Sequence, residues 1–384
     1  MGVSHGQERR KPMAQLFEET TINNLTIRNR IVRSATWEGL AGDDGSVTPR
    51  LIDVAVKLAR GGVGLIISGH AYVSREGQAG KWQLGVYGDH LAPGLARMAK
   101  AVHDNGGKIA LQLAHAGSYA NSGLSGCEPI GPTAPYTESK QVGRDMNRGD
   151  IEAVTVAFSR AAVRARTAGF DAVQIHAAHG YLLSQFLSPY FNKREDGYGG
   201  SIQNRARFAI EVFEAVRKDV GPDFPVFMKL NSEDFLSHGL TVDDMLQVSL
   251  ILEKAGIDGI EMSGGTFLSG KYYPSRQGKP APGGPEAYYE AAARRFKEKL
   301  AIPLILVGGI RSFTAAEQLV VEGAADYIAL CRPLIREPEL ANRWKSGDTR
   351  PALCISDSGC FKPGFEGKGV SCVVEAREKA AKSS

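Results

Sequence analysis

Eight short apolar runs alternate along the chain with longer segments whose apolar residues recur every three to four positions. The runs are continuous, which is typical of strands buried on both faces, and the longer segments have the spacing of amphipathic helices. The strands are expected at Arg30–Ala35, Gly64–Gly69, Lys108–Leu113, Ala172–His176, Val226–Leu230, Gly259–Met262, Pro303–Val307 and Tyr327–Leu330. The helices are expected at Pro49–Arg60, Leu91–Asn105, Ile151–Ala168, Gln203–Val220, Val242–Ala255, Glu286–Lys299 and Thr314–Glu322.

Local signals mark the ends of these helices. Gly169 and Gly256 follow two of them, at the position where a left-handed residue commonly ends a helix. Asp150 and Thr241 stand at the expected N-cap positions. Only Thr241, with Asp244 three residues later, resembles a capping box.

Eight strand–helix units predict an α/β protein with a (β/α)8 TIM barrel. A doubly wound sheet is the alternative, but it usually has fewer strands and a glycine-rich turn after the first one. Here Thr36-Trp37-Glu38 follows the first strand. We therefore expect one barrel domain over residues 15–345, with an N-terminal extension (1–14) and a C-terminal tail (346–384).

Composition and charge limit the classes of partner. The chain has 384 residues, 46 Lys and Arg against 42 Asp and Glu, and a net charge of +4. The basic residues are dispersed, so no nucleic-acid partner is expected. No window of about 18 apolar residues occurs, and the N-terminus lacks the apolar core of a signal peptide, so no membrane association is expected.

Five irregularly spaced cysteines favour reduced thiols and a cytoplasmic location. The oligomeric state stays open, a homo-oligomer included.

The ends of the last two strands carry a candidate phosphate site. Gly308 and Gly309 follow the seventh strand, and Cys331 and Arg332 follow the eighth. Loops at these two places often hold a phosphate in TIM barrels, through backbone amides and a helix N-terminus. A plain glycine turn with a surface arginine is the alternative.

The end of the fourth strand carries His176, His179 and Tyr181. A metal site is one interpretation, but no Asp or Glu stands at a matching spacing for a third ligand. The other is a histidine pair that hydrogen-bonds a substrate oxygen while the tyrosine supplies a proton. We expect no metal.

Polar residues end other strands and would meet at the same rim. Together they offer hydroxyls, an amide, a cation and an imidazole, which suits a flat ligand with polar edges and a phosphate, such as FMN. These residues are Ser34, Ala35, Thr36, His70, Gln112 and Lys229.

Four segments carry a family resemblance. Asn29–Val32 and Leu111–Gly117 are short, whereas Ile175–Leu183 and Leu187–Arg205 are long and highly specific. Together they resemble the Old Yellow Enzyme family of FMN-dependent oxidoreductases, over about Gln15 to Trp344. The resemblance implies an FMN barrel in which NADH or NADPH reduces the flavin before the substrate binds at the same face.

The resemblance also implies roles for the residues along the flavin. Ser34, Ala35 and Thr36 would lie along the isoalloxazine. Gln112 would bond to its pyrimidine edge, and Lys229 would lie beside N1 and O2, where the family usually has arginine.

Besides Lys229, three positions depart from the family pattern. Gly39 stands where some relatives have an active-site tyrosine. His70 would edge the flavin ring, where relatives often have a small residue. Trp37 stands among the cofactor contacts where relatives carry a Cys or Thr that tunes the flavin potential. Whether Trp37 is a wall of the pocket or packed core stays open.

The remaining family roles concern the phosphate and the reaction. Gly308, Gly309, Cys331 and Arg332 would hold the phosphate. The histidine pair would bind a substrate oxygen, and the tyrosine would protonate the α-carbon of an enone or enoate after hydride transfer to its β-carbon.

The tail resembles a degenerate iron–sulfur segment, like that of 2,4-dienoyl-CoA reductase relatives. Those relatives carry four cysteines spaced C-x2-C-x3-C-x11-C. Here Cys354, Cys360 and Cys372 remain, Asp357 replaces the second cysteine, and one residue is missing before Cys360. Whether these cysteines keep a redox role stays open.

The sequence thus leaves three classes of function. The first is an NAD(P)H-dependent ene-reductase. The second is the same flavin barrel acting as a dehydrogenase or demethylase, for example on an amine. The third is a non-redox barrel, either metal-dependent or ligand-binding.

Overall fold

The computed structural model describes residues 14–134, 136–137, 140–278 and 286–383. Eight parallel strands close into a ring, in which β15 pairs with β3 and β11 pairs with both β6 and β12. The (β/α)8 TIM barrel is confirmed, and the doubly wound sheet is excluded because the ring has no free edge. The strands are β3 (Ile31–Arg33), β4 (Leu65–Ile67), β6 (Ile109–Ala114), β11 (Ala172–Ala177), β12 (Val226–Asn231), β13 (Gly259–Ser263), β14 (Leu304–Val307) and β15 (Tyr327–Leu330).

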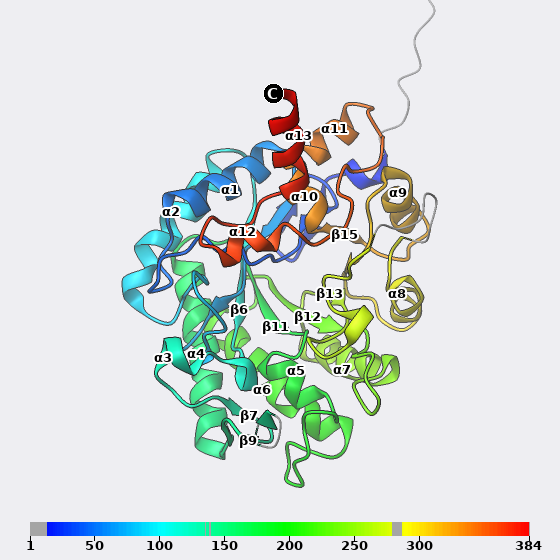
Figure 1. The fold of residues 1–384 in the computed structure, drawn as a ribbon. Helices are drawn as coiled ribbons and strands as arrows, with labels where there is room; N and C mark the ends of the chain where they lie inside the picture. The colour runs from blue at the N-terminus through cyan, green and yellow to red at the C-terminus, as the bar shows by residue number, and fades with distance from the viewer. Residues whose placement is uncertain (1–13, 135, 138–139, 279–285, 384) are drawn as a thin grey trace, which may run out of the picture.

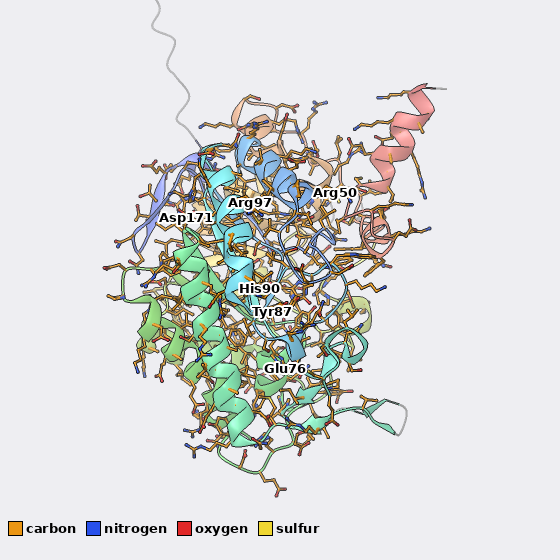
Figure 2. The ribbon with its side chains drawn as sticks, turned by 90° about the vertical axis from the view of Figure 1, so that its left-hand side faces the viewer. Arg50, Glu76, Tyr87, His90, Arg97 and Asp171 are labelled. Carbon is orange, nitrogen blue, oxygen red and sulfur yellow. The ribbon has the colours of Figure 1, made fainter. Side chains whose placement is uncertain are left out.

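In the described part of the chain, seven helices around the ring each lie in a segment where the sequence predicts one (Figure 1). Neighbouring helices such as α2 and α4 lie side by side on the outer surface (Figure 2). They are α1 (Pro49–Arg60), α2 (Ala92–His103), α4 (Arg148–Thr167), α6 (Ile202–Val220), α7 (Val242–Ala255), α8 (Glu290–Lys297) and α9 (Phe313–Val321).

Two predicted helix starts are wrong. Asn147, not Asp150, is the N-cap of α4, because the Asn147 side chain accepts from the Asp150 amide at 3.0 Å and the Asp150 carboxylate accepts from the Asn147 amide at 2.8 Å. Helix α8 begins later than the predicted Glu286, because the Glu286 carboxylate accepts from the amides of Arg311 and Ser312. The capping box of Thr241 at the start of α7 is confirmed.

The side chains of each barrel strand alternate between the ring interior and the surrounding helices. Val32, Ala110 and Phe227 belong to an interior cluster, whereas Ile31 and Leu111, each one residue away, pack in the outer core with the helices. The interior is therefore filled with side chains, as in other TIM barrels, and the chemistry lies above it.

A hairpin that was not predicted from the sequence closes the amino end of the barrel. It consists of β1 (Thr20–Ile22) and β2 (Leu25–Ile27), paired antiparallel. Its apolar side chains Ile22, Leu25 and Ile27 are buried in the interior cluster. The hairpin thereby excludes water from the base of the ring.

The segment after β15 runs back across the barrel. It holds α10 (Arg332–Arg336), α11 (Leu340–Lys345), α12 (Phe361–Phe365) and α13 (Val373–Ser383). Helix α12 lies beside the carboxyl end of the barrel (Figure 1), whereas α13 projects away from it (Figure 2). Within the described ranges, no helix has the length and apolarity that crossing a bilayer requires.

Removing the apolar contact of Ile27 with the barrel interior should destabilise the whole barrel. We predict that Ile27→Ala lowers the free energy of unfolding by about 2–5 kcal/mol, because it leaves a cavity at a fully buried site. Urea unfolding followed by circular dichroism measures the change. Thr26→Ala, at the exposed neighbouring position, is the control and should change it by less than about 0.5 kcal/mol. Equal effects of the two substitutions would contradict this role of the hairpin.

Candidate active site

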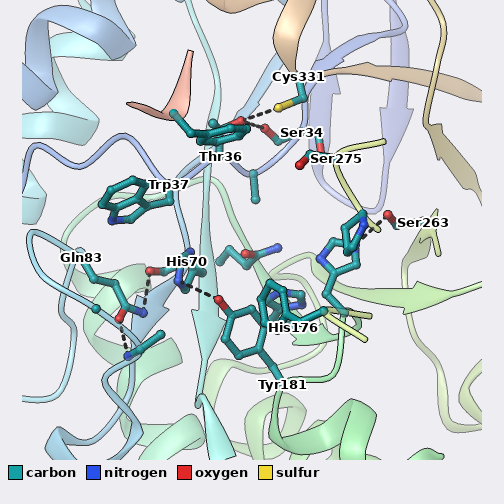
Figure 3. A pocket seen from close by; sticks show the side chains of 18 of the residues that line it. Ser34, Thr36, Trp37, His70, Gln83, His176, Tyr181, Ser263, Ser275 and Cys331 are labelled. Atoms are coloured by element: carbon teal, nitrogen blue, oxygen red, sulfur yellow. Dashed lines mark hydrogen bonds between the residues drawn. The ribbon is translucent and has the colours of Figure 1, made fainter. Parts of the chain in front are cut away.

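A cavity of about 730 Å³ opens at the carboxyl ends of the barrel strands (Figure 3). Eleven of the fourteen predicted site residues line it. They are Ser34, Ala35, Thr36, Trp37, His70, Gln112, His176, His179, Tyr181, Lys229 and Cys331. The barrel thus brings together residues that are distant in sequence, as their places at the strand ends predict.

A buried ion pair forms the floor of this cavity. The Lys229 ammonium donates to Glu261 Oε1 and to Ser34 Oγ, both at 2.9 Å, and Ser34 Oγ donates to Glu261 Oε1 at 2.6 Å. Gln174 donates to the other Glu261 oxygen at 2.8 Å, and Gln112 donates to Gln174 at 2.7 Å. Glu261 is fully buried and Lys229 is 3% exposed on its side chain. Every charge in this layer therefore has a partner.

The barrel register explains this network. Lys229 lies opposite Glu261 on the neighbouring strand, and Gln112 lies opposite Gln174. All four side chains point into the barrel, one inward position further along their strands than the apolar interior. Lys229, for example, follows the interior residue Phe227 by two positions. Glu261 and Gln174 were not predicted as site residues, although a carboxylate inside the apolar run Gly259–Met262 was a usable signal.

His176, His179 and Tyr181 converge at one side of the cavity. The centroid of the His176 ring lies 5.3 Å from that of His179 and 4.9 Å from that of Tyr181. His179 has a left-handed backbone, with φ of 64°, and Gly180 follows it with φ of 82°. A non-glycine residue in this region is strained, and such strain is common at functional sites.

Neighbours hold the histidine pair in place. The His179 amide donates to Asn231 Oδ1 at 3.1 Å, and His179 Nε2 lies 2.7 Å from Ser263 Oγ. The Ala178 amide donates to His176 Nδ1 at 3.4 Å, so the proton of a neutral His176 lies on Nε2. Asn231 and Ser263 were not predicted, because only the turn after β11 brings His179 to them.

Burial keeps these groups neutral at physiological pH. It lowers the pKa of His176 and of His179 well below 6.5, and the nearby Lys229 ammonium lowers both further. Burial also lowers the pKa of His70 to about 4 and raises the pKa of Tyr181. The Tyr181 hydroxyl lies 3.4 Å from His70 Nε2. The site therefore offers neutral imidazoles and a protonated phenol.

The three remaining predicted residues do not line the cavity within the described part of the chain. The ring of Tyr288 covers Gly309, and a Cβ added there would lie 2.4 Å from Tyr288 Cε1. The ring of Tyr289 covers Gly308, where an added Cβ would lie 2.7 Å from Tyr289 Cε2. Arg332 Nη1 donates to the Arg276 carbonyl at 2.7 Å. The phosphate role of these three residues stays a prediction.

Arg276 is a cation that was not predicted from the sequence. Its guanidinium lies 4.5 Å from the centroid of the Tyr288 ring, close to the glycine turn. Its Nε and Nη2 atoms are buried without a hydrogen-bond partner among the described residues. Two buried N–H donors without hydrogen-bond partners beside a predicted phosphate loop suit an anion.

The cysteines of the tail line a separate small hollow. Cys354, Cys360, Cys372 and Asp357 all border it. Burial raises the pKa of Cys360 to about 12, so this thiol stays protonated. Among the residues that the structure describes, no three His, Cys, Asp or Glu side chains are grouped to hold a metal ion.

Comparison with known proteins identifies the family. The model of the NADH:flavin oxidoreductase / NADH oxidase family matches residues 15–350. This chain belongs to that family. NADH oxidase of Thermoanaerobacter brockii is 38% identical over 353 residues, which cover 90% of this chain and 53% of that protein. The chain therefore spans about half the length of this relative.

Solved structures agree with the family assignment. The complex of 2-naphthoyl-CoA reductase with 2-naphthoyl-CoA has a TM-score of 0.86 and 29% identity, over 94% of this chain and 56% of that one. The Old Yellow Enzyme homologue of Zymomonas mobilis has a TM-score of 0.75 and 26% identity, over 91% and 98%. The Old Yellow Enzyme resemblance and FMN as the cofactor are thus confirmed. The iron–sulfur interpretation of the tail stays a prediction.

The described residues fit FMN in their chemistry. The polar floor supplies an amide, a hydroxyl and an ammonium for the edge of the flavin, and Arg276 has unused donors for a phosphate. The rest of the cavity wall includes aromatic side chains, among them Trp37, Trp82 and Phe267, which suit a flat ring.

Breaking the floor ion pair should destabilise the protein. We predict that Glu261→Ala lowers the free energy of unfolding by about 3–5 kcal/mol, because it leaves the Lys229 charge buried without a partner. Urea unfolding of the cofactor-free protein measures the loss, and Lys229→Met in the same chain should recover most of it. Asp104→Ala is the control, because it removes an exposed ion pair in which Lys100 Nζ lies 2.7 Å from Asp104 Oδ2. It should lower the free energy of unfolding by less than about 1 kcal/mol. A large loss that Lys229→Met fails to recover would contradict the charge explanation.

The buried histidines should make stability depend on pH. Below about pH 6.5 the unfolded chain takes up protons that folded His70, His176 and His179 do not bind, so stability is lost as the pH falls. We predict that His70→Gln makes the slope between pH 6.5 and 4 shallower by about 1.4 kcal/mol per pH unit. Urea unfolding at several pH values measures it. An unchanged slope would show that His70 titrates alike in both states.

Proposed function

We propose that this protein is an FMN-dependent oxidoreductase that uses NADH or NADPH to reduce activated alkenes such as enones and enoates. The observation that carries this proposal is the convergence of two neutral histidines and a protonated tyrosine in the cavity, beside the polar floor. The membership of the flavin oxidoreductase family supports it.

The cofactor and the chain divide the chemistry between them. When bound, FMN would supply the hydride chemistry of the reaction, with NADH or NADPH as its reductant. Ser34, Gln112 and Lys229 would hold its polar edge, because they present the hydrogen-bonding groups of the floor. Arg276 would neutralise its phosphate.

The histidine pair would bind the substrate oxygen. A neutral His176 has its proton on Nε2, and the contact of His179 Nε2 with Ser263 leaves the other ring nitrogen for a ligand. Two N–H donors directed at one carbonyl oxygen stabilise the negative charge that develops there during reduction. Neutral donors do this without the solvation cost of buried imidazolium ions.

Tyr181 would deliver the proton to the α-carbon. Burial raises its pKa, so the phenol holds its proton until a strongly basic carbon forms beside it. His70, whose backbone carbonyl accepts from Gln83 Nε2 at 3.2 Å, lies against the phenol oxygen and orients it. The chain would thus hold one oxygen and protonate one carbon of the same substrate.

Removing the phenol hydroxyl tests this assignment. We predict that Tyr181→Phe slows reduction of 2-cyclohexenone by about 10²-fold or more, because the proton donor is lost. Reduction of the flavin by NADH or NADPH should keep its rate, since it needs no proton from Tyr181. Stopped-flow absorbance of the flavin follows the two half-reactions separately.

Tyr273→Phe is the matched control, because Tyr273 also lines the cavity. It should change either half-reaction by less than about threefold, within the effect of one neutral hydrogen bond. Equal losses in both half-reactions of Tyr181→Phe would overturn the role of Tyr181. Oxidation of amines with no alkene reduction would favour the dehydrogenase alternative instead.

A further inference from the structure

The C-terminal segment, which comprises the described residues after 346, forms part of the cavity wall. Ser358, Phe361 and Phe365 line the same cavity as the histidine pair, although they lie far beyond the last barrel strand. The sequence predicts only a tail outside the barrel for this segment. Its contacts show how it comes to the mouth of the site.

Hydrogen bonds tie this segment to the loop after β3 and to helices α1 and α10. The Val370 amide donates to the Glu38 carbonyl at 2.8 Å, and Arg50 of α1, labelled in Figure 2, donates to the Lys368 carbonyl. On the other side, Ser358 Oγ accepts from Arg332 of α10 at 2.9 Å and donates to the carbonyl of Ser275, in the loop after β13, at 3.2 Å. The segment is therefore held on both sides of the cavity.

Glycines let the segment approach two tryptophans closely. A Cβ added to Gly364 would lie 2.9 Å from Trp37 Cζ3, and one added to Gly367 would lie 3.1 Å from the Trp82 ring. Both tryptophans line the cavity. The sequence leaves open whether Trp37 lines the pocket or packs in the core. The structure shows that Trp37 is part of the pocket wall.

Phe365 completes an aromatic surface at the mouth. Its ring stacks on Trp37 with centroids 5.0 Å apart, yet the residue is 72% exposed. Phe267 and Tyr273, which follow β13, line the same cavity, and their ring centroids lie 5.6 Å apart. Exposed aromatic side chains gathered around a cavity are typical of a binding surface for an apolar ligand.

We propose that Trp37, Phe361 and Phe365 form a subsite that selects alkenes bearing a flat aromatic group next to the reacting double bond. The polar groups of the cavity lie at its floor and at the histidine pair, so the carbonyl end of the substrate binds there. The aromatic end then extends to the wall that the C-terminal segment supplies. This proposal rests on the proposed alkene reduction, and its test separates the two.

A matched pair of ketones tests the subsite. Pent-3-en-2-one and 4-phenylbut-3-en-2-one differ only in a methyl or phenyl group on the β-carbon. Equilibrium dialysis with the oxidised, FMN-loaded protein gives both dissociation constants without turnover. We expect the phenyl ketone to bind at least about tenfold more tightly than the methyl ketone.

The selectivity is the ratio of the two dissociation constants. Phe365→Ala should reduce this ratio about fivefold, which is the effect of losing one aromatic contact. Because Phe365 is exposed, its loss leaves no buried cavity that would unfold the protein, and the FMN dissociation constant is measured alongside. Leu353→Ala is the control, because Leu353 is a 59% exposed residue of the same segment outside the cavity. It should leave the selectivity within about twofold of that of the unsubstituted protein, because substitutions at exposed surface positions usually have small effects.

The outcomes separate the two proposals. Selective binding that depends on Phe365, without reduction of either ketone, would support the subsite and contradict the proposed reaction. Equal selectivity in the original protein and Phe365→Ala would overturn the subsite, as would equal losses in Phe365→Ala and Leu353→Ala. Weaker FMN binding with unchanged ketone selectivity would also overturn it, because Phe365 would then contact the cofactor.

Discussion

The buried ion pair between Lys229 and Glu261 is the constraint on which the site depends. Two opposite charges inside a barrel are tolerable only when each has close partners, and here Ser34 and Gln174 supply the remaining hydrogen bonds. The pair lies directly above the apolar interior, which the β1–β2 hairpin closes from below. The barrel is therefore apolar at its base and polar at the end where the cavity opens.

This arrangement also sets the protonation of the groups above the floor. Burial disfavours charged imidazoles, and the Lys229 ammonium adds a repulsion that lowers the pKa of His176 and His179 further. The same burial raises the pKa of the Tyr181 phenol, so it stays protonated. One cavity thus holds neutral hydrogen-bond donors and a weak acid, and the proposed reduction of a polarised alkene would use both.

Much of this molecule follows from the sequence alone. Continuous apolar runs alternating with amphipathic segments determine the barrel, because strands buried on both faces have that composition. The strand ends then bring His176, His179, Tyr181, Gln112 and Lys229 to one rim, since parallel strands of a closed barrel end at the same face. Capping was predicted less well, because Asn147 and Asp150 both suit the start of α4 and only the backbone geometry chooses between them.

Tertiary structure alone decided the partners and the boundaries of the site. Glu261 and Gln174 are paired by strand register, which the local sequence does not contain. Phe365 reaches Trp37 only because glycines in the C-terminal segment permit a close approach. Periodicity and spacing report which residues share one element, whereas contacts between distant segments depend on how those elements pack in space.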